Sequence, residues 1–189
     1  MARKAFLAIF FLAGLLTIGR AEEKITNEEY EVYADILRPV LAYPGKENKP
    51  IRYNLWKSTS TMGIEGLTLQ DQVFVKLAGD AHLALDEGLS EDFLQKNQKE
   101  FVLSEKFDVP GLEIRLISPE NRRISLTFPV DPDSCFQSFS RVGFNKSRSQ
   151  ALVIGGTHCE PEGGGGHLFL LVKENSNWKI KGRVRLWIE

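Results

Sequence analysis

Residues 135–159 read CFQSFSRVGFNKSRSQALVIGGTHC, and this stretch decides the fold because it has the form of two strands joined by a short turn. The runs 136–145 and 150–158 are rich in apolar and β-branched residues, which favour strands. The polar residues at 146–148 separate them and would form the tip of the turn. The sequence therefore predicts an antiparallel hairpin that reverses at 146–148.

The register of this hairpin brings the two cysteines of the chain together. If Asn145 pairs with Ser149, an antiparallel ladder places Cys135 directly opposite Cys159. Opposed residues lie about 4.5–5.5 Å apart at Cα, which falls in the range that a disulfide spans. The register follows from the turn alone, and we predict a Cys135–Cys159 disulfide on that basis.

Strand-like patterns continue on both sides of the hairpin. Apolar and polar residues alternate through 112–116 and 124–128 with turn chemistry between them, which predicts a second hairpin over 112–128. Two further runs at 167–173 and 178–188 complete an antiparallel β-meander of about five or six strands. Apolar residues of the last run are expected to share one face: Trp178, Ile180, Val184, Leu186 and Ile188.

The N-terminal half has helical and irregular patterns instead. Thr26 and Glu29 fit a capping box, and the apolar residues after them repeat with helical spacing until Pro39 kinks or ends the helix. Residues 44–66 are expected to be loop with one short strand, and 67–106 a mixed region. Helices early and strands late indicate an α+β domain, with the N-terminal helix and the mixed middle packed on the C-terminal sheet.

Residues 1–21 have the parts of a secretory signal peptide. Basic residues precede the apolar run AFLAIFFLAGLLTI at 5–18, and small residues stand at the −3 and −1 positions of a cut after Ala21. The run is shorter than the roughly 20 apolar residues of a transmembrane helix. We therefore expect cleavage, a single domain over 22–189 with no stable membrane span, and a secreted or periplasmic location.

Composition excludes several classes of function. Cleavage would reduce the 24 basic residues to 21 against 25 acidic ones, so the formal charge would change from −1 to −4. A mildly acidic chain is unsuited to nucleic acid or to an anionic membrane as its main partner. With only two cysteines, the chain is neither a disulfide-rich miniprotein nor a metal cage built from several thiolates.

The segment THCEPEGGGGH at 157–167 permits three interpretations. It could bind a metal ion, but neighbouring strand residues point to opposite faces, which separates the ligands. It could cradle a phosphate, but a strand and not a helix follows the glycines. We favour a bend in which glycines allow positive φ and close approach, so neither metal nor cofactor is predicted. The potential metal ligands are His158, Cys159, His167, Glu160 and Glu162.

No catalytic constellation is evident elsewhere in the sequence. His82 joins the two histidines above, and no serine stands in a Gly-x-Ser-x-Gly motif. The acidic pairs 86–87 and 91–92 fit solvated helix positions and first-turn acids. An N-glycosylation sequence begins at Asn145 and would matter in a eukaryotic host. Basic residues that could bind an anionic polymer or simply face solvent are Lys179, Lys181, Arg183 and Arg185.

Several segments of the chain occur together in a recurrent order: EDFLQKN (91–97), FSRVGFN (139–145), QALVIGG (150–156), Cys159, the glycines 163–166, FLLVKENSNWKI (169–180) and WIE (187–189). In this order they resemble a family of exported bacterial proteins with no assigned activity. The resemblance implies a bacterial, periplasmic or secreted setting and a sheet that ends in a meander. It transfers no catalytic or binding residue.

These observations favour an exported, non-enzymatic protein that binds a small molecule or an envelope protein between its sheet and its helices. The alternative is a small hydrolase-like enzyme that uses acidic residues or a histidine. A buried carboxylate or His82 at the bottom of an apolar cleft would favour that alternative.

Overall fold

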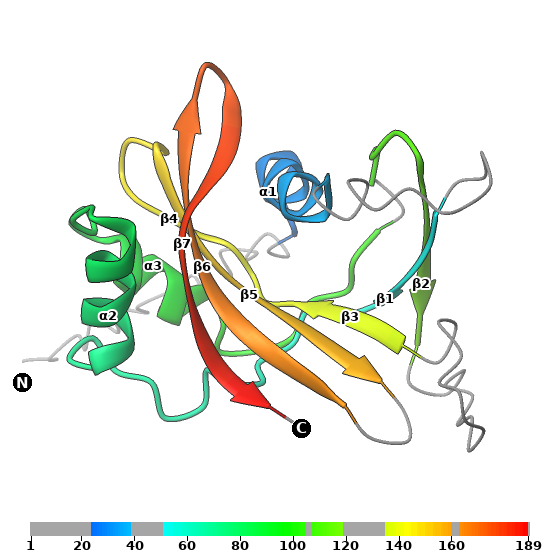
Figure 1. The fold of residues 1–189 in the computed structure, drawn as a ribbon, viewed down its shortest axis with the longest axis horizontal. Coiled ribbons are helices and arrows are strands. Elements are labelled where there is room, and N and C mark those ends of the chain that lie inside the picture. Colours follow the sequence, from blue (N-terminus) through cyan, green and yellow to red (C-terminus); the bar gives the residue numbers. More distant parts are fainter. Residues whose placement is uncertain (1–23, 39–50, 105–106, 119–134, 160–162, 189) are drawn as a thin grey trace, which may run out of the picture.

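The structure is a computed structural model that describes residues 24–38, 51–104, 107–118, 135–159 and 163–188. Within these residues one mixed sheet has the strand order β2-β1-β3-β5-β6-β7, with β4 paired to β5 (Figure 1). This architecture confirms the α+β class. The elements are α1 (Asn27–Leu37), β1 (Ile51–Trp56), α2 (Gln72–Ala81), α3 (Leu89–Lys96), β2 (Leu112–Ile117), β3 (Cys135–Phe139), β4 (Gly143–Phe144), β5 (Gln150–Cys159), β6 (Gly164–Glu174) and β7 (Asn177–Ile188).

Strands β3 to β7 are antiparallel, as predicted, but the other edge of the sheet is parallel. β1 pairs in parallel with both β2 and β3. Parallel neighbours need a long crossover, and the chain between β1 and β2 provides one that contains α2 and α3. β2 covers the first half of the hairpin predicted over 112–128, and the second half lies outside the described residues.

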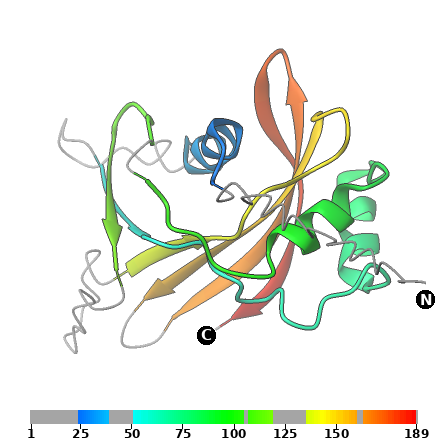
Figure 2. The same cartoon turned by 180° about the vertical axis from the view of Figure 1, so that it is seen from behind.

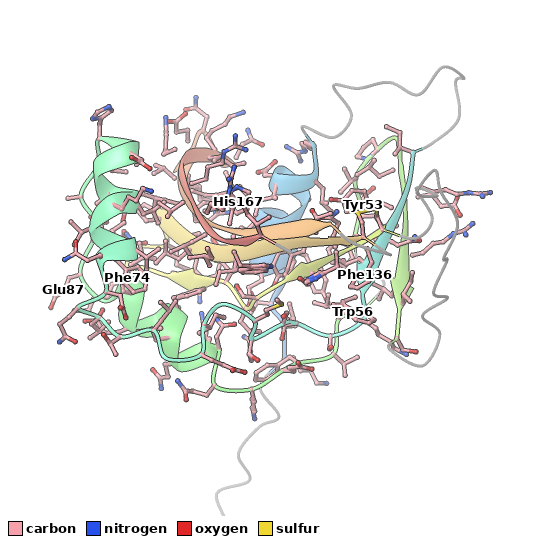
Figure 3. All side chains as sticks on the ribbon, turned by 60° about the horizontal axis from the view of Figure 1, so that its bottom comes forward. Tyr53, Trp56, Phe74, Glu87, Phe136 and His167 are labelled. Carbon is pink, nitrogen blue, oxygen red and sulfur yellow. A yellow bond between two sulfur atoms is a disulfide. The ribbon has the colours of Figure 1, made fainter. Side chains whose placement is uncertain are left out.

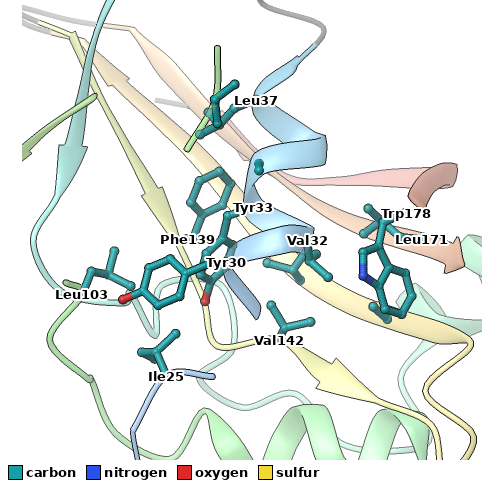
Figure 4. Close-up of a cluster of buried hydrophobic side chains, with 14 of the residues drawn as sticks. Ile25, Tyr30, Val32, Tyr33, Leu37, Leu103, Phe139, Val142, Leu171 and Trp178 are labelled. Carbon is teal, nitrogen blue, oxygen red and sulfur yellow. The ribbon is translucent and has the colours of Figure 1, made fainter. Parts of the chain in front are cut away.

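Helix α1 begins as the sequence predicts. The Thr26 side chain accepts a hydrogen bond from the Glu29 backbone N–H, and the Glu29 carboxylate accepts one from the Thr26 N–H at 2.8 Å. The apolar face of the helix packs on the sheet in a cluster that includes Tyr33, which stacks on Phe139 with ring centroids 4.8 Å apart (Figure 4). This contact fixes α1 across the middle of the sheet.

The sheet separates two apolar cores, and β5 contributes to both. Ala151 and Val153 point into the cluster beneath α1, and Leu152 and Ile154 point into the cluster beneath α2 and α3. Strands β5 to β7 run between α1 and the α2–α3 pair in both views of the ribbon (Figures 1 and 2). All four side chains are buried, so β5 is the central strand of the molecule.

The predicted disulfide is present, although the register near the turn differs from the prediction. Cys135 pairs with Cys159 across β3 and β5, and the two residues are bonded with Cα atoms 4.1 Å apart. At the turn, however, the Asn145 N–H donates to the Gln150 carbonyl oxygen, so the predicted Asn145–Ser149 pairing is wrong by one residue.

A β-bulge restores the register between the turn and the cysteines. β4 pairs Gly143 with Leu152, and β3 pairs Phe139 with Gly155, so the segment between β4 and β3 contains one extra residue. Side chains satisfy the backbone there: the Arg141 N–H donates to Asn97 Oδ1 at 2.7 Å. The Val142 N–H donates to Glu29 Oε1 at 3.3 Å.

A buried ion pair ties the bulge to α1. Arg141 Nε lies 2.7 Å from Glu29 Oε1, and the two side chains are 1% and 0% exposed. The guanidinium also stacks on Phe101, 4.3 Å from the ring centroid. The Glu29 carboxylate therefore has two roles: it completes the capping box of α1, and it neutralises the Arg141 charge that the bulge carries into the core.

A second register shift changes the face of β7. Trp178 belongs to the core beneath α1, whereas Val184 belongs to the core beneath α2 and α3. The ladder with β6 shifts between Leu170 and Leu171, which face Gly182 and Ile180. The prediction that the apolar residues of this strand share one face is therefore wrong, because one inserted residue reverses the alternation.

The predicted signal peptide lies outside the described residues. Among those that the structure does describe, no helix combines the length and apolar character needed to cross a bilayer. The Cys135–Cys159 bond is compatible with an oxidising, extracytoplasmic compartment.

Candidate functional site

A cavity of about 480 Å³ lies on the α1 side of the sheet. Its walls come from the C-terminal turn of α1 and from five strands, β1, β3, β5, β6 and β7. Its volume is in the range typical of small-molecule sites. The residues that line it include Ile36, Tyr53, Gln137, Phe139, Thr157, His167, Phe169 and Arg185.

The floor of the cavity consists of two neighbouring rows of residues. Within each row, the residues are cross-strand partners on successive strands. One row runs from Phe139 through Gly155 and His167 to Arg185. Both rows have a glycine at an interior position, Gly155 in this row and Gly165 in the next, between Thr157 and Ile188. Because Gly155 has no side chain, two aromatic rings lie close to the strand there: an added Cβ atom would be 3.1 Å from Phe169 and 3.2 Å from Phe139. The two glycines and the two rings all line the cavity.

The adjacent glycines serve the opposite face of the sheet. A Cβ atom on Gly166 would lie 2.0 Å from the Trp187 indole, and one on Gly156 would lie 2.9 Å from it. The ring therefore lies directly on the backbone of β5 and β6. Gly163, just before β6, has φ +141°, which favours glycine. The glycines thus provide close approach and positive φ, as predicted, and their closest neighbour is an indole ring rather than another backbone.

The two ionisable residues that meet in the cavity are His167 and Arg185. Partial burial lowers the pKa of His167 below its ordinary value of 6.5, and the positive charges of Arg183 and Arg185 lower it further. Burial also raises the pKa of Tyr53, so its phenol stays neutral. No aspartate or glutamate lies among the described lining residues, and this end of the cavity is therefore electropositive.

A hydrogen-bonded pair forms the polar part of the floor. The Thr157 hydroxyl donates to Gln137 Oε1 at 2.6 Å. Because this bond uses the oxygen of the Gln137 amide, its N–H groups remain as potential donors of a residue that lines the cavity. Ile36, Phe139 and Phe169 supply apolar surface around the pair, so the cavity combines apolar walls with a few convergent polar groups.

The potential metal ligands do not converge. His158 lies on the opposite face from His167, stacked on Phe136 with ring centroids 5.1 Å apart, and Cys159 is held in the disulfide. Figure 3 shows the two faces: Tyr53 and His167 are labelled above the sheet, and Phe136 and Trp56 below it. Within the described residues no group of three or more metal-binding side chains exists, and Glu160 and Glu162 lie outside them.

Of the residues considered for catalysis, His167 lines the cavity, whereas His82 and the acidic residues lie outside it. His82 is exposed at the end of α2. The carboxylates of Asp86 and Asp92 accept hydrogen bonds from the Asn145 side chain and the Phe144 N–H, so both support the hairpin. Asn145 itself is 3% exposed, and its amide is bonded within the turn, so the folded chain does not offer it for glycosylation.

Sequence reasoning missed the residues that build the cavity. Gln137 and Thr157 are ordinary strand residues. Arg185 was noted only as one of four basic residues that could bind an anionic polymer or face solvent. His167 was considered as a potential metal ligand and as one of three histidines available for catalysis, but not as part of a cavity. The register of the cysteine hairpin already placed Gln137 opposite Thr157, so this pair could have been found by extending the register. Arg185 could not, because its face depends on the shift in β7. Sequence reasoning also missed the contact of Ser138 Oγ with His158 Nε2 at 3.3 Å, on the opposite face.

Comparisons with family models, curated proteins and solved structures found no match to this chain. The likeness of the C-terminal segments to exported bacterial proteins therefore stays an expectation, and the function must be argued from the geometry of the site.

Proposed function

We propose that this chain is an exported, non-enzymatic protein that binds a small molecule in the cavity between α1 and the sheet. The observation that carries the proposal is the hollow itself. Glycine, aromatic and polar residues from five strands and from α1 line it, and its volume is about 480 Å³. A partly open hollow of this volume, with apolar walls and a few polar groups, is in the range typical of small-molecule sites.

The positions of the acidic groups support binding over hydrolysis. The fully buried carboxylate that the hydrolase alternative would need is Glu29, but it is bonded to Arg141, the Thr26 N–H and the Val142 N–H. These partners occupy it as a structural anion. No carboxylate lines the described part of the cavity to act beside His167 as a second acid or base.

Export is supported by the signal-like residues 1–21 and by the Cys135–Cys159 disulfide. An envelope protein was the other partner expected from the sequence. The structure offers a concave, partly apolar cavity, which suits a small molecule better than a protein surface.

The test uses the neutral fluorescent probe N-phenyl-1-naphthylamine with a variant that fills the cavity. Ile36→Trp adds an indole at the cavity wall, so the saturable fluorescence increase expected with the wild-type protein should fall at least tenfold in affinity. Val75→Trp is the matched control, because Val75 also lies on a helix but is 64% exposed on α2. Probe binding that is absent from the folded wild type, or equal in both variants, would contradict the proposal.

A further inference from the structure

The two ends of the cavity differ in charge. At the β6–β7 end His167 and Arg185 are cross-strand partners, which places their Cα atoms about 5 Å apart. Arg183 lies two residues earlier on the same face, opposite Phe169. At the β1 end stands the neutral phenol of Tyr53, with Ile36 and Phe139 as apolar neighbours in the lining. The cavity is therefore cationic at one end and apolar at the other.

The positive charge at the β7 end is not neutralised within the described residues. Other cations around the α1 side of the sheet have carboxylate partners: Arg141 binds Glu29, and both Arg148 and Lys173 bind Glu28. In the part of the chain that the structure describes, no carboxylate lies within ion-pair distance of Arg183 or Arg185. A ligand anion would supply the missing negative charge.

Resting on the proposed function, we propose that the ligand is a small monocarboxylate with an apolar body. Its carboxylate would bind Arg185 beside an N–H donor of His167. Its body would lie along Phe169 and Phe139 toward Tyr53. A guanidinium is well suited to this role, because it stays charged and its N–H donors match the geometry of a carboxylate.

The ring of His167 supports this arrangement. Burial and the charges of Arg183 and Arg185 hold its pKa low, so the imidazole is neutral at pH 7 and can donate one hydrogen bond. Binding of an anion would offset those charges and favour protonation, which adds a second attractive charge in the complex. The groups that face His167 from β5, Gly155 and Thr157, are uncharged.

The experiment measures displacement of N-phenyl-1-naphthylamine by decanoate, decanol and acetate. Decanoate should displace the probe at a lower concentration than decanol, and acetate should fail at the same concentration because it has no apolar body. Arg185→Gln should raise the dissociation constant for decanoate about fivefold and leave that for decanol within twofold, as expected for one charge-assisted contact of an exposed side chain. Lys179→Gln, on the same strand but outside the cavity, should change neither constant.

Each outcome separates the two proposals. If decanol competes as well as decanoate, or if neither displaces a bound probe, the carboxylate assignment is wrong and small-molecule binding stands. The assignment also fails if Lys179→Gln weakens decanoate as much as Arg185→Gln, which would indicate general charge attraction, or if acetate competes equally. Absence of probe binding to the folded wild-type protein overturns both.

Discussion

Single glycines determine how both faces of this sheet are used. In β5 and β6, Gly155 and Gly165 line the cavity on one face, where Gly155 lets the Phe139 and Phe169 rings lie close to the strand. Gly156 and Gly166 admit the Trp187 ring on the other face. The sequence shows that glycines cluster here, and their role in close approach could be predicted. Which side chain approaches them could not, because Trp187 belongs to another strand whose register shifts beside Gly166.

The contact between Gly166 and Trp187 predicts a large effect for one added methyl group. Gly166→Ala places a Cβ atom 2.0 Å from the indole, so the ring or the strand must move, and we expect a loss of about 1–3 kcal/mol in the free energy of unfolding. Gly79→Ala is the matched control. Nothing lies within 4 Å of its added atom inside α2, and helix propensity should stabilise the protein by roughly 0.5–1 kcal/mol. Urea denaturation measures the free energy of unfolding of both variants. Equal losses of stability in Gly166→Ala and Gly79→Ala would contradict the role of the contact with Trp187.

The lowered pKa of His167 predicts how stability depends on pH. As pH falls below the ordinary pKa of 6.5, the imidazole becomes protonated in the unfolded chain. In the folded chain, burial and the charges of Arg183 and Arg185 lower its pKa, so protonation there needs a lower pH. The unfolded state then binds more protons, so the free energy of unfolding falls as pH decreases from 6.5 toward the folded pKa. His167→Gln should flatten this part of the profile, measured by urea denaturation between about pH 7 and pH 5. A profile with unchanged slope would contradict the assignment, and His82→Gln, outside the cavity, is the control.

At the scale of elements, the hairpin shows how a correct pairing can follow from an incorrect register. The sequence prediction placed Cys135 opposite Cys159 by pairing Asn145 with Ser149. The structure confirms the cysteine pair but contradicts the Asn145–Ser149 pair. The inserted residue near Arg141 compensates for that error. Neither the register error nor the inserted residue can be read from the alternation of the strands. The bulge is held by the side chains of Glu29 in α1 and of Asn97 at the end of α3, which are distant in sequence. The helix α1, by contrast, was predictable because its cap is local.

The bulge makes the ion pair beneath α1 a sensitive point of the fold. Glu29→Gln leaves the Arg141 charge buried without its anion, and we expect a loss of about 3–5 kcal/mol in the free energy of unfolding. The control is Glu28→Gln, at the preceding residue of α1. Its carboxylate bridges Arg148 and Lys173 near the surface, where such pairs contribute about 0–1 kcal/mol. Denaturant titration of both variants measures the difference, and equal losses would show that the buried pair is not what holds the bulge.

At the scale of the whole molecule, the two cores share the strands that separate them. Successive residues of β5 enter opposite clusters, and β6 does the same, with Leu170 beneath α2 and α3 and Leu171 beneath α1. Loss of either helix layer would expose one face of these strands and remove the packing that orders the other. If residues 22–189 form a single domain, as expected from the sequence, the two cores should unfold together in one cooperative transition.

Tryptophan fluorescence tests that cooperativity, because the three tryptophans report on opposite faces. Trp178 lies in the α1 core, while Trp56 and Trp187 lie on the other face, near Phe136 and the β5–β6 glycines. Trp178→Phe leaves reporters on one face only, and the double variant Trp56→Phe/Trp187→Phe leaves a reporter on the other. For each variant, the fluorescence midpoint should coincide with the midpoint from far-UV circular dichroism in the same urea titration, because β5 and β6 unfold once and take both cores with them. A separate, earlier transition seen by one reporter would show that its face unfolds alone, and the shared strands would then not bind the two cores into one unit.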